Sequence, residues 1–210
     1  MKVSIQNSQF TCQDIQAVLF DLDGTLVEST GLISDILSQW ASAQGLDVQS
    51  VLNYSHGKRT IDIVQHYIKD ERITEHYYAL TQRFLEAAVY TQSIPYAAEF
   101  IHQIEQHKIP WMVVSSSERI LIEARMVAAQ LPLAKQVIAA EDIQYGKPDP
   151  EGYLKAAQML NIPIQSCLIF EDSPSGIKAA QSAQAQLIII GQAETAENVA
   201  LDFSKLLLVS

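Results

Sequence analysis

Short apolar segments alternate with helical patterns along much of the chain. Strand-like apolar runs occur at residues 17–20, 111–114, 136–139, 167–170 and 187–190. Between the later runs, the spacing of apolar residues predicts helices at 97–106, 118–130, 151–160 and 175–182. Continuous apolar strands that alternate with helices are typical of a parallel sheet with helices on both faces. The sequence therefore predicts an α/β fold with a doubly wound parallel sheet.

Residues 27–93 follow a different pattern, in which apolar residues recur at helical spacing and no strand intervenes. Helices are expected at 32–45 and 74–90, with one or two more between them. The chain leaves and returns near the first strand, so these helices form an insert. We therefore expect a core made of residues 1–26 and 94–210, with a small helical cap domain at 27–93.

The first strand stops abruptly at two carboxylates, Asp21 and Asp23, which are followed by Gly24. In a regular strand both side chains would point the same way, and Gly24 permits a tight turn. Taken alone, the motif also fits a solvated turn with two capping acids. Later strands, or the loops that follow them, contribute further polar groups: Ser115, Lys147, and Glu171 with Asp172. Because the site of an open α/β sheet lies beyond the carboxyl ends of its strands, we expect all of them to converge there.

The overall charge restricts the classes of partner. The chain has 14 basic and 24 acidic residues, a net charge of −10 at pH 7. General nucleic-acid binding and binding to anionic membranes both require basic surfaces, so neither is expected.

Cys12 and Cys167 do not suggest a disulfide framework, and the N-terminal residues lack an apolar signal segment. No apolar run approaches membrane-spanning length. We therefore expect a cytoplasmic protein that is a monomer or a weak dimer.

Taken together, the motifs resemble those of the haloacid dehalogenase-like superfamily of phosphotransferases, over almost the whole chain. The matching segments are Asp21-Leu22-Asp23-Gly24-Thr25, the strand ending in Ser115, Gly146-Lys147-Pro148-Asp149-Pro150, and Glu171-Asp172-Ser173-Pro174-Ser175-Gly176. The resemblance implies a Rossmann-like core. The insert looks like the small cap of the subfamily that contains β-phosphoglucomutases and sugar phosphatases. Residues 55–60 look like the cap segment of sugar-phosphate and glycerol-phosphate phosphatases.

The resemblance implies a role for each acid. A phosphomonoester dianion repels a carboxylate nucleophile, and Mg²⁺ bridging the two cancels that repulsion. Asp21 is expected to attack phosphorus and form an aspartyl-phosphate. Asp23 is expected to protonate the leaving oxygen and then to deprotonate the attacking water. Asp21, Asp172 and the backbone carbonyl of Asp23 are expected to bind Mg²⁺; Glu171 either joins them or orients Asp172 or Lys147.

Phosphate oxygens are expected to be bound by Ser115, Ser116 and Lys147, with help from the helix N-terminus that follows. Two simpler interpretations remain open. Ser115 could be only a helix N-cap, which is the commonest local role of such a serine. Lys147 could be only a surface charge on a loop.

The cap contributes a glycine-containing turn with cations, which suits a loop that faces the substrate. We expect His56, Lys58 and Arg59 to contact the leaving group, and we favour Arg59 because its planar fork suits hydroxyls or phosphate. Alternatively, Lys58 and Arg59 begin a solvated helix and pair with Asp62 or Asp70.

The predicted function is a Mg²⁺-dependent phosphatase acting on a small phosphorylated metabolite, a sugar phosphate or a polyol phosphate. A sugar phosphomutase would use the same two aspartates, and a non-catalytic phosphate-binding domain is a third possibility. Two positions depart from the family pattern, Tyr96 where a glycine is frequent and Gln184-Ala185-Gln186 in place of an Ala-Gly-Cys type of turn. These departures concern loop geometry and leave the expected catalytic residues unchanged.

Overall fold

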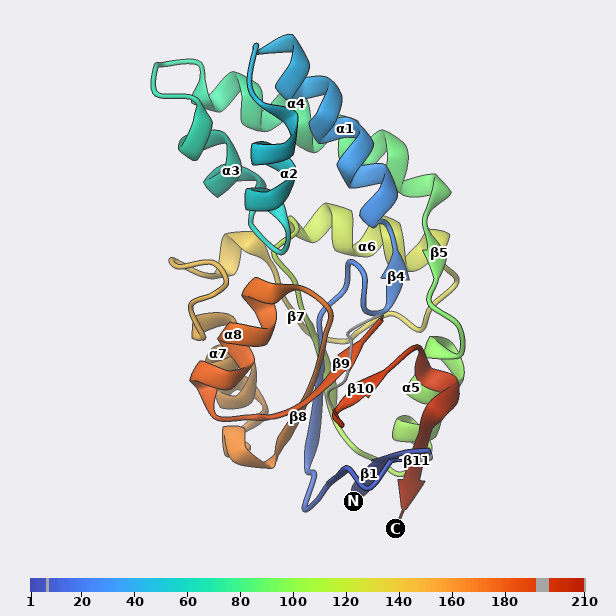
Figure 1. Ribbon diagram of the computed structural model, residues 1–210. Helices are drawn as coiled ribbons and strands as arrows, with labels where there is room; N and C mark the ends of the chain where they lie inside the picture. The colour runs from blue at the N-terminus through green and yellow to red at the C-terminus, as the bar shows by residue number, and fades with distance from the viewer. Residues whose placement is uncertain (7, 192–196, 210) are drawn as a thin grey trace.

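The computed structural model in Figure 1 describes residues 1–6, 8–191 and 197–209. Its main sheet has six parallel strands in the order β10-β9-β8-β3-β6-β7. The strands are β3 (Ala17–Phe20), β6 (Trp111–Val114), β7 (Val137–Ile138), β8 (Cys167–Glu171), β9 (Gln186–Ile190) and β10 (Val199–Ala200). The predicted parallel sheet is confirmed. The two-residue strand β10 was not predicted, because so short a segment carries no periodic pattern.

Helices cover both faces of this sheet. The helices are α5 (Ala97–Gln106), α6 (Arg119–Ala128), α7 (Glu151–Leu160) and α8 (Pro174–Ala183). Phe20 and Phe170 face a core with side chains from α5 and α6, whereas Leu19 and Ile169 face a core with side chains from α7 and α8. All four residues of β3 are fully buried. Since full burial of one large apolar side chain contributes roughly 1.5–3 kcal/mol, β3 is firmly fixed where the acidic motif begins.

A second sheet lies at the end of the molecule that carries both termini, away from the inserted helices (Figure 1). It consists of β1 (Lys2–Ile5), β2 (Thr11–Cys12) and β11 (Leu206–Val209), paired antiparallel in the order β11-β1-β2. Short 3₁₀ helices occupy Ala88–Tyr90, Ala140–Asp142, Ile164–Ser166 and Phe203–Lys205. The three-stranded sheet lies far from the site described below, which is at the other end of the main sheet (Figure 1).

Four helices form the insert: α1 (Thr30–Ala43), α2 (Val48–Ser55), α3 (Thr60–Tyr67) and α4 (Ile73–Ala87). The chain enters through β4 (Val27–Glu28) and leaves through β5 (Gln92–Ser93), which pair antiparallel. The four helices have their own apolar core, and they sit above the carboxyl edge of the main sheet (Figure 1). We call them the cap. Among the residues that the structure describes, no helix combines the length and apolar character needed to cross a membrane.

Candidate active site at the carboxyl edge of the sheet

Asp21 lies directly beyond β3 and next to the end of β8. Its backbone N–H donates to the carbonyl of Phe170 at 2.9 Å, so the sheet fixes its position, and the residue is only 6% exposed. The chain then turns at Gly24, whose φ of +93° is unfavourable for residues with a side chain. A Cβ atom at this position would also overlap the carboxylate of Asp172. The glycine therefore allows the first motif and the end of β8 to approach closely.

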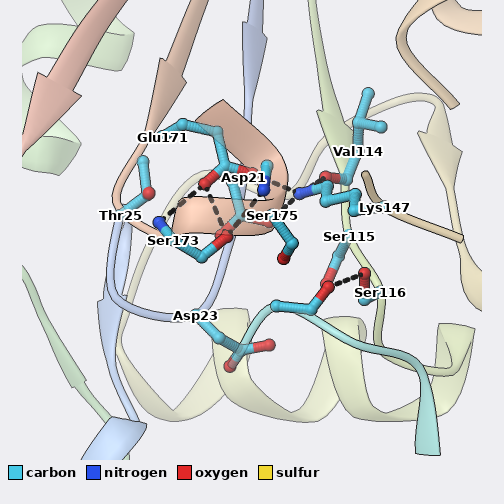
Figure 2. Close-up of polar contacts among 12 residues, drawn as sticks. Asp21, Asp23, Thr25, Val114, Ser115, Ser116, Lys147, Glu171, Ser173 and Ser175 are labelled. Atoms are coloured by element: carbon cyan, nitrogen blue, oxygen red, sulfur yellow. Dashed lines mark hydrogen bonds and ion pairs between the residues drawn. The ribbon is translucent and has the colours of Figure 1, made fainter. Parts of the chain in front are cut away.

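Lys147 joins the two acidic strand ends. Its Nζ donates to Asp21 Oδ1 and to Glu171 Oε1, both at 2.5 Å, and to the carbonyl of Val114 at 3.3 Å. All three partners are at the ends of different strands, and Lys147 itself is 5% exposed. Lys147 is therefore a buried ion-pair partner, and the interpretation as a surface loop charge does not describe it (Figure 2).

Both carboxylate oxygens of Glu171 are already engaged by donors. Besides Lys147, Oε1 accepts from the hydroxyl of Tyr153 at 2.9 Å. Oε2 accepts from the backbone N–H groups of Asp172 and Ser173, each at 2.9 Å, and from the Ser173 hydroxyl at 3.1 Å. The side chain of Glu171 is fully buried. Its contacts orient Lys147 and the start of the Asp172 loop, the second of the two roles considered for this residue.

The charges of this cluster shift the ionisation of its members. Burial raises the pKa of Asp21, and Glu171 and Asp172 raise it further, whereas Lys147 lowers it; the net shift is well upward. Burial lowers the pKa of Lys147, but Asp21 and Glu171 raise it by more, so the ammonium form is strongly favoured. Burial also raises the pKa of Asp172, which His56 partly opposes. A divalent cation at these oxygens would reverse the upward shift of the acids, because it favours their ionised form.

The donor set fits a hard divalent cation. Asp21, Glu171 and Asp172 each offer a carboxylate oxygen, and these oxygens all lie within 4.8 Å of one another. Three carboxylates face one ammonium group, so negative charge is in excess when all are ionised. Oxygen donors are what Mg²⁺ prefers. Since Glu171 is saturated with hydrogen bonds, Asp21 and Asp172 are the better candidates for direct contact with the ion.

Asp23 points away from this cluster (Figure 2). Arg125 Nη1 donates to both of its carboxylate oxygens at 2.8 Å. The hydroxyls of Ser29 and Ser117 donate to the same carboxylate, at 2.5 and 2.8 Å. Arg125 is a buried residue of α6, and its Nη1 also donates to the Ser117 hydroxyl at 2.7 Å. The Asp23 carboxylate thus accepts hydrogen bonds from Arg125 and two hydroxyls, and its side chain does not join the three candidate metal ligands.

The serines after β6 have separate partners. Ser115 is buried, and its hydroxyl accepts from the backbone N–H of Ser117 at 3.0 Å. This is a local turn contact; α6 has Glu118 at its N-cap position, so Ser115 is not its cap. Ser116 donates its hydroxyl to the backbone carbonyl of Gly57 at 2.8 Å. Ser116 therefore connects the sheet edge to the cap loop in this structure, although we predicted that it binds phosphate.

The cap cations divide into two groups. Arg59 forms a two-point ion pair with Asp62, at 2.8 Å through Nε and 2.8 Å through Nη2, and it donates to the carbonyls of Ile143 and Gln144. The structure therefore does not bring Arg59 to the leaving-group side, where we expected it. Lys58 instead donates to the carbonyl of Lys147 at 2.8 Å.

His56 lies above the acidic cluster, with Nε2 3.3 Å from Asp172 Oδ2. The hydrogen bond to Asp172 raises the pKa of His56, and burial opposes this shift. His56 and Lys58 both line the cavity described next, and their contact with a leaving group stays a prediction.

One cavity of about 200 Å³ lies between the cap and the sheet edge. Its lining includes six of the predicted site residues: Asp21, Asp23, His56, Lys58, Ser115 and Ser116. Lys147, Glu171 and Asp172 are connected to this floor through the hydrogen bonds described above. A cavity of this size over a carboxylate floor has room for a small polar ligand.

A protein family described as haloacid dehalogenase-like hydrolase matches residues 15–184. The chain belongs to the haloacid dehalogenase-like hydrolases. Hexitol phosphatase A of Escherichia coli (strain K12) is 33% identical over 175 residues, which are 82% of this chain and 81% of that protein. Glycerol-1-phosphate phosphohydrolase 1 of Saccharomyces cerevisiae (strain ATCC 204508 / S288c) is 29% identical over 201 residues, 91% of this chain and 78% of that protein.

Solved structures show the same fold. The β-phosphoglucomutase structure from Clostridium difficile superposes with a TM-score of 0.80 at 20% identity, covering 90% of this chain and 91% of that one. At this identity the likeness concerns the fold alone. The resemblance to haloacid dehalogenase-like hydrolases, and the doubly wound core with a helical insert, are confirmed.

Two residues that contact the candidate site were not predicted from the sequence. Arg125 follows Leu121 and Ile122 at helical spacing, so it occupies the apolar face of the predicted helix. Tyr153 likewise lies on the buried face of α7, together with Ala156 and Ala157. A charge or a hydroxyl at a core position needs a polar partner, because burying it unpaired is costly. That argument could have identified both residues, but not their partners.

Proposed function

We infer that the protein is a Mg²⁺-dependent phosphatase that hydrolyses small phosphomonoesters, sugar phosphates or polyol phosphates, through an aspartyl-phosphate. The observation that supports this most strongly is the cluster of Asp21, Glu171 and Asp172 around Lys147, with Asp21 on the floor of the cavity. Relatives named as a hexitol phosphatase and a glycerol-1-phosphate phosphohydrolase support the substrate class. Residues 27–93 would act as the cap domain over this floor.

Each residue would have a defined part in the reaction. A carboxylate oxygen of Asp21 forms a bond to phosphorus while the bond from phosphorus to the ester oxygen breaks. Asp23 gives a proton to that departing oxygen, and later takes one from the water that hydrolyses the aspartyl-phosphate. To reach the ester oxygen, Asp23 has to leave the contacts with Arg125, Ser29 and Ser117 that hold it in this structure.

The remaining groups bind charge. Bound through Asp21, Asp172 and the backbone carbonyl of Asp23, Mg²⁺ would neutralise the repulsion between nucleophile and phosphate. Lys147 compensates charge on the phosphoryl oxygens and keeps Asp21 directed at the cavity. Ser115 and Ser116 line the cavity at the carboxyl end of β6, where phosphate oxygens would lie.

A phosphate-release assay tests the proposal. Hexitol phosphates, glycerol phosphates and hexose 6-phosphates are incubated with the enzyme in Mg²⁺ and in EDTA. We expect Mg²⁺-dependent release, and a loss of about 1,000-fold or more in the Asp21→Asn variant, because the nucleophile is removed. Asp35→Asn, an exposed position on α1, is the matched control. Turnover that survives Asp21→Asn in a folded variant would refute the assignment.

A further inference from the structure

The two aspartates of the first motif have separate cations. Asp21 is paired with Lys147, whereas Asp23 is paired with Arg125. Both aspartates and Arg125 line the cavity, and Figure 2 shows Asp23 directed away from Lys147. The two carboxylates therefore have different charge partners, although only Leu22 separates them in the sequence.

Arg125 is placed for its contact by the packing of α6. It is 3% exposed and lies on the same buried helix face as Leu121 and Ile122. Its Nη1 is 2.8 Å from each carboxylate oxygen of Asp23 and 2.7 Å from the Ser117 hydroxyl. Of the acids in the described ranges, Asp23 is the one that Arg125 contacts. Burying a guanidinium on an apolar helix face is costly unless it is paired, so this pair requires an explanation beyond packing.

Two hydroxyls complete the set of donors around Asp23. Ser29 occupies the N-cap position of α1, where a serine ordinarily accepts from a backbone N–H of the first turn. Among the described residues its side chain makes no such bond, and it donates to Asp23 Oδ1 at 2.5 Å instead. Ser117 donates to Asp23 Oδ2 at 2.8 Å. Four hydrogen bonds from three separate segments thus converge on one carboxylate, which is more than a solvated turn acid needs.

We propose that Arg125 is the positioning residue for Asp23: it holds this carboxylate at the wall of the cavity, apart from the acids around Lys147, and so keeps it available for proton transfer. This role rests on the proposed phosphatase function. Three carboxylates already face the single ammonium group of Lys147. Without Arg125, a fourth carboxylate would be free to turn toward that cation, and it would then be out of place for the ester oxygen.

Arg125 acts in this scheme only through Asp23. The proton on Asp23 passes to the ester oxygen as the bond from that oxygen to phosphorus breaks, and Asp23 is left as a carboxylate. Asp23 turns away from Arg125 to make this transfer, and Arg125 sets the position from which the turn begins. Because both residues line the same cavity, the turn takes place within it. Misplacing a reacting group by about 1 Å can cost on the order of 100-fold in rate, so the starting position matters.

Two substrates with different leaving groups test this role. In glycerol 1-phosphate the departing alkoxide is a strong base that needs a proton, whereas the acetate of acetyl phosphate is a weak base that departs without one. The measured quantity is kcat/KM, because it includes the step in which the leaving group departs. Arg125→Met should lower kcat/KM by about 30- to 100-fold for glycerol 1-phosphate and by less than about 3-fold for acetyl phosphate.

Arg119→Met is the matched control, because Arg119 is exposed on the same helix, and it should change neither value. An equal loss on both substrates in Arg125→Met, or a gain on glycerol 1-phosphate, would overturn the proposal. Absence of phosphate release from every ester in the wild-type enzyme would contradict the proposed function, and the role of Arg125 with it.

A double-mutant cycle separates an effect through Asp23 from a direct effect on the substrate. Asp23→Asn alone should lower kcat/KM for glycerol 1-phosphate by about 100-fold or more, because the proton donor is lost. Adding Arg125→Met to Asp23→Asn should change this value by less than about 2-fold, since two residues that act as a unit are not additive. Losses that multiply would overturn the proposal.

Ser117→Ala provides a milder variant in case Arg125→Met does not fold. It removes a hydroxyl that contacts both Asp23 and Arg125, and it leaves the buried cation in place. We expect the same pattern at smaller size, a loss of about 3- to 10-fold in kcat/KM for glycerol 1-phosphate and none for acetyl phosphate. A folded Ser117→Ala enzyme that hydrolyses both substrates as the wild type does would overturn the proposal.

Discussion

The floor of the cavity and the cap above it are built by opposite means. At the floor, Lys147 contacts two acids from different strand ends at 2.5 Å, and both oxygens of Glu171 accept hydrogen bonds. In the cap, apolar side chains from all four helices pack into a core of their own, and the cavity is lined there by both apolar and polar residues. The groups that could act on a phosphate therefore come from the sheet edge, whereas the cap lines the space above them. The predictions below test whether the two regions can be changed separately.

The largest effect is expected from Lys147→Met. It removes the cation that both Asp21 and Glu171 contact, so charge on the phosphoryl oxygens loses its compensation. We expect kcat to fall by about 100- to 1,000-fold, with similar relative losses for all substrates because the cap residues that line the cavity are unchanged. Steady-state kinetics on a hexitol phosphate and a glycerol phosphate measure this. Lys135→Met, at an exposed position, is the control. A loss confined to one substrate class would show that the floor and the cap are not independent.

Asp172→Asn should abolish the response of stability to Mg²⁺. In the wild-type protein, binding of the ion to the folded state raises the melting temperature with concentration. With one of the candidate ligand carboxylates neutralised, we expect the shift at 10-fold the wild-type dissociation constant, about 1.4 kcal/mol in free energy, to vanish. Differential scanning fluorimetry with and without Mg²⁺ provides the measurement. Asp149→Asn, at an exposed position in the Lys147 loop, is the control. An undiminished Mg²⁺ shift in Asp172→Asn would exclude Asp172 as a ligand.

Glu118→Gln tests the boundary between the floor of the cavity and the cap. Burial raises the pKa of Glu118, while its own backbone N–H and the hydroxyls of Thr60 and Tyr77 lower it; Glu141 adds to the rise. An acid whose pKa is higher in the folded state destabilises the protein above that pKa, and the penalty disappears as the pH falls below the unfolded value. The variant should therefore be more stable than wild type by about 1 kcal/mol at pH 8 and by less at pH 5. Urea unfolding at both pH values decides this. Glu123→Gln, exposed on the same helix, should show no such difference.

The smallest effect is expected at a turn that lies in neither the floor of the cavity nor the cap. Gln184 ends α8 with φ of +62°, a left-handed conformation that favours glycine. Gln184→Gly should stabilise the fold by about 0.5–1 kcal/mol, with kinetics unchanged for every substrate. Gln181→Gly, at an exposed position inside the same helix, should destabilise it by about 1 kcal/mol. Chemical denaturation compares the two, and a loss of stability in Gln184→Gly would contradict the strain that we infer from the φ angle.

Much of the floor could be predicted from the sequence, because a strand's end is a local property. Asp21 and Glu171 each follow an apolar run, Lys147 lies in the loop after another, and parallel strands bring their carboxyl ends to one edge. The partner of Asp23 could not be predicted in this way. Arg125 is 102 positions away, and only the packing of α6 beneath the cap brings it to the carboxylate.

The cap was predicted less well, for physical reasons. The planar fork of Arg59 suits a substrate, but Asp62 lies one helical turn away and matches the same fork at no cost in loop closure. Ser116 was expected to bind phosphate, yet the cap loop offers it a carbonyl first. Tyr96 stands where glycine is frequent in the family, and Gln184 begins the other turn that departs from the family pattern; both adopt φ above +60°. Each of these side chains therefore occupies a left-handed conformation that glycine adopts more readily.

The loop at residues 56–57 rests on the sheet edge through its backbone oxygens: Ser175 donates to the carbonyl of His56 at 2.9 Å and Ser116 to that of Gly57 at 2.8 Å. Any amino acid supplies a carbonyl, so these two hydrogen bonds do not depend on the side chain at position 56. That side chain can be exchanged, by selection or by design, while the loop keeps its position on the sheet edge. Gly57 is the exception, since a methyl group there would collide with Ser173 and Ser175. The fold thus allows the side chain at position 56 to change while Gly57 and the backbone of the loop stay fixed. Such an arrangement would let new substrates be accepted without a new loop structure.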